Sequence, residues 1–363
     1  MGAARWFLAA TVLGFGLACA GETGSIGTPE PEPDPEPAPA PAVPVRQQLQ
    51  TVTTRIGTLE RSAWLHLPDG NDGTKMPLIV MLHSEDSDAK KFANVAAPFF
   101  DRGVAFLFPS GRPGQVPAEP VEGKTGKRKR QDPVPEPARD EVELGEPWQD
   151  EGDRAWIEVV VDQVVRANAI DPEQVYVAGL GDGGRLVLEL ACAASSSSTF
   201  HGYAPVGASL SREAAKTCEA PGFPAPTLVI AGTDDDVTLW TGDKDHLSIS
   251  ETAEFFAKKN DCDLSSRKED LLEDVDGSDE TRVKRHSWSC EGAAVELLEV
   301  TGGGHTWPHP SLRAPAKTSR DIDALAEITD LFAIALDEVA APNVPTMPPS
   351  PREGKGKRGK RHQ

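Results

Sequence analysis

The stretch Tyr176–Leu186, YVAGLGDGGRL, decides the fold class of this 363-residue chain. A short apolar run leads into four glycines within six residues, and an apolar helical pattern follows. This is the layout of a nucleophile elbow, in which a strand, a sharp turn and a helix present a catalytic side chain at the turn. The elbow pattern G-x-S-x-G needs serine at its third position, where this chain has Gly181.

Strand and helix patterns alternate on both sides of this turn. Several short apolar runs are typical of strands buried on both faces of a sheet. The predicted strands cover 55–68, 76–83, 104–109, 174–179, 226–232, 283–288 and 294–300, and the predicted helices cover 89–101, 153–170, 183–194, 248–259 and 321–339. The alternation predicts an α/β fold, with a mostly parallel central sheet, right-handed crossovers and helices on both faces.

The composition of the remaining segments indicates one globular domain with flanking tails. The domain is predicted at 51–340, and it contains a long polar insertion at 110–150 that we expect to be disordered. Residues 20–50 are rich in proline and glutamate, which predicts a disordered, extended spacer. Residues 341–363 form a basic tail that is also expected to be disordered.

Residues 1–19 have the pattern of an export signal, with a positive charge, a short apolar core and small residues around Cys19. The apolar core is too short for a good membrane span. The segment Leu17–Cys19 resembles the lipobox of bacterial lipoproteins. That resemblance predicts a lipid anchor at Cys19 as the sole membrane attachment, and a location in the bacterial cell envelope. Ordinary cleavage near Ala18 or Ala20, followed by secretion, is the alternative.

Cysteine usage supports export. Four cysteines remain when Cys19 is set aside, which is enough for two disulfides. Of the three possible pairings we favour Cys192–Cys218 with Cys262–Cys290, because each bond then closes a short loop. Reduced, buried cysteines are the alternative. No ligand spacing predicts a metal site, and no cofactor is expected. The net charge of −20 disfavours nucleic acid as a partner.

Two further motifs follow the turn in the order that an α/β-hydrolase requires, with the nucleophile before the acid and the acid before the base. The sequence AGTDDDV at 231–237 follows a predicted buried strand, where an acid loop belongs. The sequence GGGHTWP at 302–308 follows the strand at 294–300 and precedes the last helix. Upstream, LHS at 82–84 ends an early strand, where a backbone N–H could help to form an oxyanion hole.

This set of motifs resembles the secreted esterases of the poly(3-hydroxybutyrate) depolymerase and feruloyl esterase type, from about Arg55 to Phe332. The most specific parts are GGGHTWP and the stretch that reads IDP…VYVAGL. The resemblance implies the α/β-hydrolase fold and carboxylic-ester hydrolysis. It assigns the general base to His305 and the acid to Asp235, to within one position because both neighbours are also aspartates. The role of the acid would be to orient the imidazole and stabilise its charged form.

The chain departs from that family at two places. It has Gly181-Asp182 where the family has Ser-Asn, and His83-Ser84 where the family has His-Gly. Gly181 cannot form an alkoxide, so no acyl-enzyme can follow, although glycine tolerates the positive φ of such a turn. We therefore predict little or no serine-esterase activity. The cleft is expected to bind an ester, a polyester fragment or a cell-wall component.

Several alternatives stay open. Nucleophilic attack by Asp182, or a water molecule activated by His305, would make the chain an active ester hydrolase. The chain would otherwise be an interaction module of the envelope. Ser84 is expected to narrow the pocket at the oxyanion corner. Trp307 and Trp240 are candidates for an aromatic wall of the cleft, with packing at the domain edge as the alternative reading.

Overall fold

The computed structural model describes residues 49–56, 59–69, 73–111, 148, 151–195, 198–218, 223–311 and 315–337, all of which belong to one compact unit. The predicted export signal with Cys19, the spacer up to residue 48 and the tail at 341–363 lie outside the described residues. The predicted insertion at 110–150 also lies outside them, except for its two ends and Trp148.

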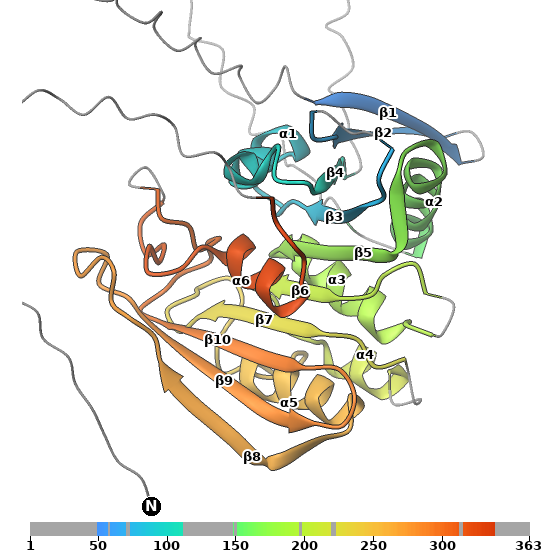
Figure 1. The fold of residues 1–363 in the computed structure, drawn as a ribbon. Helices are drawn as coiled ribbons and strands as arrows, with labels where there is room; N and C mark the ends of the chain where they lie inside the picture. Colours follow the sequence, from blue (N-terminus) through green and yellow to red (C-terminus); the bar gives the residue numbers. More distant parts are fainter. Residues whose placement is uncertain are drawn as a thin grey trace, which may run out of the picture. The chain divides into compact units, whose positions relative to one another are not determined.

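A ten-stranded sheet forms the centre of the described residues (Figure 1). Its order is β1-β2-β4-β3-β5-β6-β7-β10-β9-β8. The six central strands, from β4 to β10, pair in parallel, and the outer strands at both edges pair antiparallel. The strands are β1 (Gln50–Ile56), β2 (Leu59–His66), β3 (Met76–Leu82), β4 (Ala105–Pro109), β5 (Ile170–Leu180), β6 (Tyr203–Val206), β7 (Thr227–Gly232), β8 (Cys262–Leu271), β9 (Arg282–Cys290) and β10 (Val295–Thr301). The prediction of a mostly parallel central sheet is confirmed.

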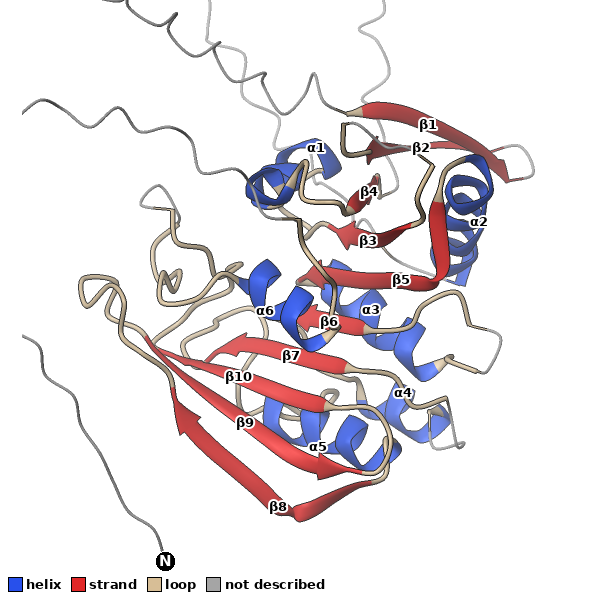
Figure 2. Cartoon of the chain, viewed as in Figure 1, coloured by secondary structure: helices blue, strands red, loops and turns tan. Residues whose placement is uncertain are grey.

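Helices cover both faces of the sheet (Figure 2). They are α1 (Ala89–Phe92), α2 (Glu151–Ala167), α3 (Asp182–Cys192), α4 (Arg212–Thr217), α5 (Ile249–Lys259) and α6 (Ala324–Leu331), with two 3₁₀ turns, η2 (Ala93–Val95) and η3 (Ala97–Phe99). Apolar side chains of α2, α3, α4 and α5 pack in one cluster, and those of α1 and α6 pack in another.

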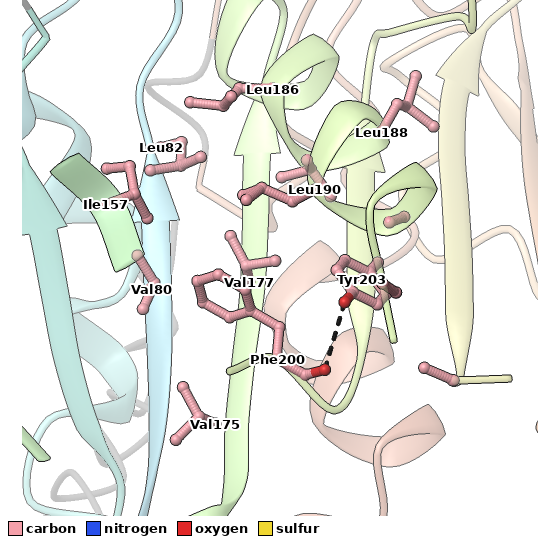
Figure 3. Packing of buried hydrophobic residues seen from close by; sticks show 14 of the residues in the cluster. Val80, Leu82, Ile157, Val175, Val177, Leu186, Leu188, Leu190, Phe200 and Tyr203 are labelled. Carbon is pink, nitrogen blue, oxygen red and sulfur yellow. Dashed lines mark hydrogen bonds between the residues drawn. The ribbon is translucent and has the colours of Figure 1, made fainter. Parts of the chain in front are cut away.

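The two clusters lie on opposite faces because side chains alternate along each strand. In β3, Leu78, Val80 and Leu82 belong to the cluster with α2 and α3, whereas Ile79 and Met81 belong to the other. Figure 3 shows Leu82 near Leu186 of α3 and Val80 near Ile157 of α2. A strand whose two faces are both covered must be apolar throughout. This explains why β3 reads as a continuous apolar run.

The structure differs from the predicted elements where local chemistry interrupts a pattern. The strand expected at 55–68 is part of the hairpin of β1 and β2. The helix expected at 89–101 becomes α1 followed by the 3₁₀ turns, because Pro98 cannot donate a helical hydrogen bond. The elements β6, α4 and β8 were not predicted, since β6 and α4 are short and β8 is polar and mostly exposed.

The last helix is shorter than the predicted 321–339. It begins at Ala324 and ends at Leu331. Ala333 adopts a φ of 53°, and Ile334 N–H donates to the carbonyl of Thr329 at 2.9 Å. This is the hydrogen bond of a Schellman cap, which terminates a helix. The amphipathic pattern beyond Leu331 therefore does not continue the helix.

Both predicted disulfides are present. Cys192–Cys218 joins the end of α3 to the residue after α4, and Cys262–Cys290 joins β8 to β9. The loops they close span 26 and 28 residues, and such cross-links stabilise a fold mainly by restricting the unfolded chain. In the part of the chain that the structure describes, no helix is long and apolar enough to cross a membrane.

A buried ion pair joins the hairpin to α2. Arg61 lies in β2 and Asp153 in α2, with side chains that are 3% and 0% exposed and that hydrogen-bond to each other. The Arg61 guanidinium also lies over the ring of Trp156, 3.9 Å from its centroid. Removing one partner of such a pair leaves an uncompensated buried charge.

We expect Asp153→Ala to lower the free energy of unfolding by about 3–5 kcal/mol, because Arg61 then stays buried without its counter-ion. Chemical denaturation measures the change. The matched control is Asp162→Ala on the same helix, which removes the exposed pair with Arg166. The control should lose far less stability, since exposed ion pairs contribute little. Equal losses in both variants would contradict the prediction.

Candidate functional site

The candidate site lies at the carboxyl ends of four strands from the parallel centre of the sheet. Loops after β3, β5, β7 and β10 carry the residues that the sequence singles out, and these strands belong to the parallel centre of the sheet. Figure 1 shows them in one sheet, with β6 between β5 and β7. The carboxyl ends of parallel strands meet at one edge, where α/β proteins place their ligands. The topology therefore brings together segments that are far apart in the sequence.

Gly181 forms the sharp turn between β5 and α3. Its φ is 57° and its ψ is −119°, a conformation open to glycine but strained for other residues. Gly183, in the first turn of α3, has no room for a side chain, since an added Cβ would lie 2.3 Å from the carbonyl oxygen of Leu82. The glycines thus let α3 start directly against the end of β3, as the strand–turn–helix prediction requires.

Asp235 is the buried member of the aspartate run after β7. Its side chain is fully buried, whereas its neighbours Asp234 and Asp236 are exposed. Oδ1 accepts hydrogen bonds from the backbone N–H groups of Val237 and Thr238, at 2.9 and 2.7 Å. Oδ2 accepts from Nδ1 of His305 at 2.9 Å. The loop therefore holds this carboxylate with one oxygen fixed by backbone and the other directed at the imidazole.

His305 lies between two carboxylates. Nδ1 donates to Asp235, and Nε2 lies 3.8 Å from Oε1 of Glu85. Nε2 is buried and makes no hydrogen bond with the described residues. Burial opposes the charged imidazole, but the hydrogen bond to Asp235 and the negative charges of Asp235, Glu85 and Asp86 outweigh it. The pKa of His305 is therefore raised above its ordinary value.

The loop after β3 is fixed by His83 and Trp148. Nδ1 of His83 donates to the carbonyl of Ser84 at 2.9 Å, and Nε2 accepts from the N–H of Gly111 at 3.0 Å. Trp148 Nε1 donates to the carbonyl of His83 at 2.9 Å. Burial lowers the pKa of His83, despite its hydrogen bond to Ser84, and so favours the neutral ring that these contacts need.

None of the remaining candidates makes a hydrogen bond to Nε2 of His305. Ser84 is buried and its hydroxyl donates to Asp86 at 2.6 Å. The Asp182 carboxylate lies 3.6 Å from Nε of Arg185. Trp307 packs edge-on against Phe92 in one hydrophobic cluster.

Trp240 packs against the other cluster, on the opposite face of the sheet. The structure therefore does not bring Trp240 and Trp307 into one wall.

Glu85 is the functional-site residue that the sequence analysis missed. Its Oε2 accepts a hydrogen bond from the backbone N–H of Asp182 at 3.3 Å. The sequence motifs point to His83, Ser84 and Asp182 as the oxyanion and cleft candidates. A carboxylate next to Ser84 in the sequence was the available signal, but nothing in the sequence shows that it reaches across to the turn at Gly181.

Two cavities flank His305. One, of about 190 Å³, is lined by residues that include Glu85, Asp182 and Val237. The other, of about 480 Å³, is lined by residues that include Ser84 and Trp307. His305 thus lines two spaces that could each take part of a ligand. Among the described residues, no cluster of histidine, cysteine and carboxylate side chains could hold a metal ion.

We expect the charged form of His305 to stabilise the fold in acid and to lose that effect as the pH rises. A group whose pKa is higher in the folded state than in the unfolded state stabilises the fold at pH values below the unfolded pKa, which is about 6.5 for histidine. This stabilisation is lost as the pH rises through the folded-state pKa. The difference in the free energy of unfolding between wild type and His305→Gln should therefore shrink as pH rises above about 6.5.

Urea denaturation over a series of pH values measures this difference. The same comparison in an Asp235→Asn background is the control, and its pH dependence should be much weaker because the main partner of the imidazolium is gone. A difference that stays constant or grows with pH in the wild-type background would rule the prediction out.

Comparison with known proteins agrees with the fold. No protein-family model matches the chain. The sequence is 27% identical over 260 residues to the protein named "Putative esterase NocK" from Nocardia uniformis subsp. tsuyamanensis, and the match covers 67% of each chain. The structure is similar to that of an acetyl xylan esterase from Aspergillus awamori, with a TM-score of 0.51, 14% identity, and coverage of 79% of this chain and 99% of that one. The chain therefore has the α/β-hydrolase fold, and its sequence is similar to that of an esterase-like protein.

Proposed function

We propose that this chain is an exported, esterase-related α/β-hydrolase-fold protein with little or no serine-esterase activity, and that its cleft binds an ester, a polyester fragment or a cell-wall component. The observation that carries the proposal is that His305 and Asp235 are hydrogen-bonded to each other while the residue at the turn is Gly181. The base and its orienting acid are retained, but the turn residue offers no atom from which the imidazole can take a proton.

The protonation of His305 supports the same conclusion. A general base must be unprotonated to accept a proton. The carboxylates around His305 raise its pKa and so reduce the neutral fraction near pH 7. A charged imidazole with a free N–H is instead suited to donating a hydrogen bond to a ligand in the adjoining cavities.

Hydrolysis through Asp182 is the weaker alternative. Its carboxylate is engaged with Arg185 and follows the turn residue by one position. Hydrolysis by a water molecule that His305 activates needs the neutral imidazole, which the raised pKa disfavours. A pure envelope interaction module would not need the ordered His305–Asp235 pair or the cavities on both sides of it.

The proposal predicts that the purified domain hydrolyses p-nitrophenyl acetate and butyrate no faster than its His305→Gln variant, because no nucleophile is present for the base to activate. A fluorophosphonate probe should leave the wild type unlabelled. A competent serine esterase in the same assay is the control. Stoichiometric labelling, or turnover that His305→Gln abolishes, would overturn the proposal.

Export and lipid anchoring form the second part of the proposal. They are supported by the pattern of residues 1–19 and by the two disulfides, which are typical of proteins in oxidising compartments. In a bacterial host, the full chain should fractionate with membranes and Cys19→Ser should release it, because the anchor is the thioether-linked lipid. Equal membrane retention of both forms would exclude a lipid anchor at Cys19.

A further inference from the structure

We propose that Glu85 occupies the oxyanion position of this cleft, so that an ester bound in the cleft cannot place its carbonyl oxygen there. The absence of a side chain at position 181 leaves room for this carboxylate. This deepens the proposed function, on which it rests, by naming the residue that determines what the site rejects.

The position of the carboxylate is defined by two neighbours. Oε2 accepts from the backbone N–H of Asp182, and Oε1 lies 3.8 Å from Nε2 of His305. The N–H of the residue after the turn is the group that stabilises the developing oxyanion in an elbow of this kind. A negatively charged oxygen of the protein itself therefore takes the hydrogen bond that a substrate oxygen would need.

Gly181 provides the space for this arrangement. A Cβ at position 181 would lie 2.7 Å from Oε2 of Glu85 and 2.7 Å from Nε2 of His305. Both distances are shorter than the contacts that Cβ atoms make in proteins. Any side chain at the turn therefore competes with Glu85 for the same volume, and the carboxylate can lie where it does because residue 181 is glycine.

Two effects follow for ligands. A carbonyl oxygen that gains negative charge would meet the carboxylate of Glu85 rather than a free N–H, which is repulsive in a partly buried site. The carboxylate also helps to keep His305 charged, since it is one of the groups that raise its pKa. Restoring serine at position 181 alone would thus supply a nucleophile while Glu85 still competes for the N–H of Asp182 and still raises the pKa of the base.

The test compares fluorophosphonate labelling of Gly181→Ser with that of Gly181→Ser/Glu85→Ala. In the labelling step the serine Oγ forms a bond to phosphorus, fluoride leaves, and the Oγ proton passes to Nε2 of His305. We expect the double variant to label about 100-fold faster, the order of effect seen for one oxyanion donor. Gly181→Ser/Glu291→Ala, which removes an exposed carboxylate in the turn after β9, is the matched control and should label like Gly181→Ser.

Equal labelling of the single variant and the Glu85 double variant, whether both are fast or both are silent, would overturn the inference. This result would not contradict the proposed function, because that function is tested by ester hydrolysis and labelling of the wild-type chain. Circular dichroism checks that each variant is folded.

A second measurement does not depend on introducing serine. Glu85→Gln in the otherwise wild-type chain should lower the pKa of His305, followed by NMR of the imidazole, while Glu291→Gln should leave it unchanged. An unchanged His305 pKa in Glu85→Gln would contradict the placement of Glu85 beside the ring.

Discussion

The hydrogen bond between His305 and Asp235 organises the carboxyl edge of the sheet. It joins the loop after β7 to the loop after β10, and the same two loops are tied by backbone contacts, among them Asp234 N–H to the carbonyl of Gly303 at 2.8 Å. Because Asp235 is fully buried, its charge needs the two backbone N–H groups and the imidazole that surround it. The orientation of His305 toward the turn at Gly181 is a consequence of this anchoring.

The opposite side of the imidazole shows how the site differs from a working serine hydrolase. A serine triad combines a hydroxyl at the turn, a neutral base and an open pair of donors for the oxyanion. Here the turn residue is Gly181, the base is flanked by carboxylates, and the N–H of Asp182 is taken by Glu85. The three departures are physically coupled, since the space that glycine leaves is the space that the carboxylate fills.

Several hydrogen bonds hold the loop after β3 in place and so define the position of Glu85. His83 is fixed on both ring nitrogens, and Trp148 holds its carbonyl. The ring of Trp148 stacks with that of Trp156, and the Arg61 guanidinium lies over it. The loop after β3 is therefore in contact with the buried ion pair of β2 and α2. A loop held at so many points presents the next residue, Glu85, in a limited range of positions.

The sequence by itself determined the class of fold, the order of the motifs along the chain and the absence of a side chain at position 181. These follow from local information. The spacing of apolar residues indicates whether one or both faces of an element are buried, and a glycine indicates a backbone conformation that other residues rarely adopt. It also favoured the disulfide pairing, since loop length depends only on spacing. It overestimated the last helix, because the cap at Ala333 replaces a pattern that remains amphipathic beyond it.

Only the tertiary structure decided which aspartate faces the imidazole and what lies opposite it. Asp235 differs from its two neighbours by burial, which depends on how the loop turns. The reach of Glu85 to Asp182 joins residues 97 positions apart in the chain. Such a contact is set by the meeting of strand ends in the folded sheet, and neither periodicity nor spacing in the sequence carries that information.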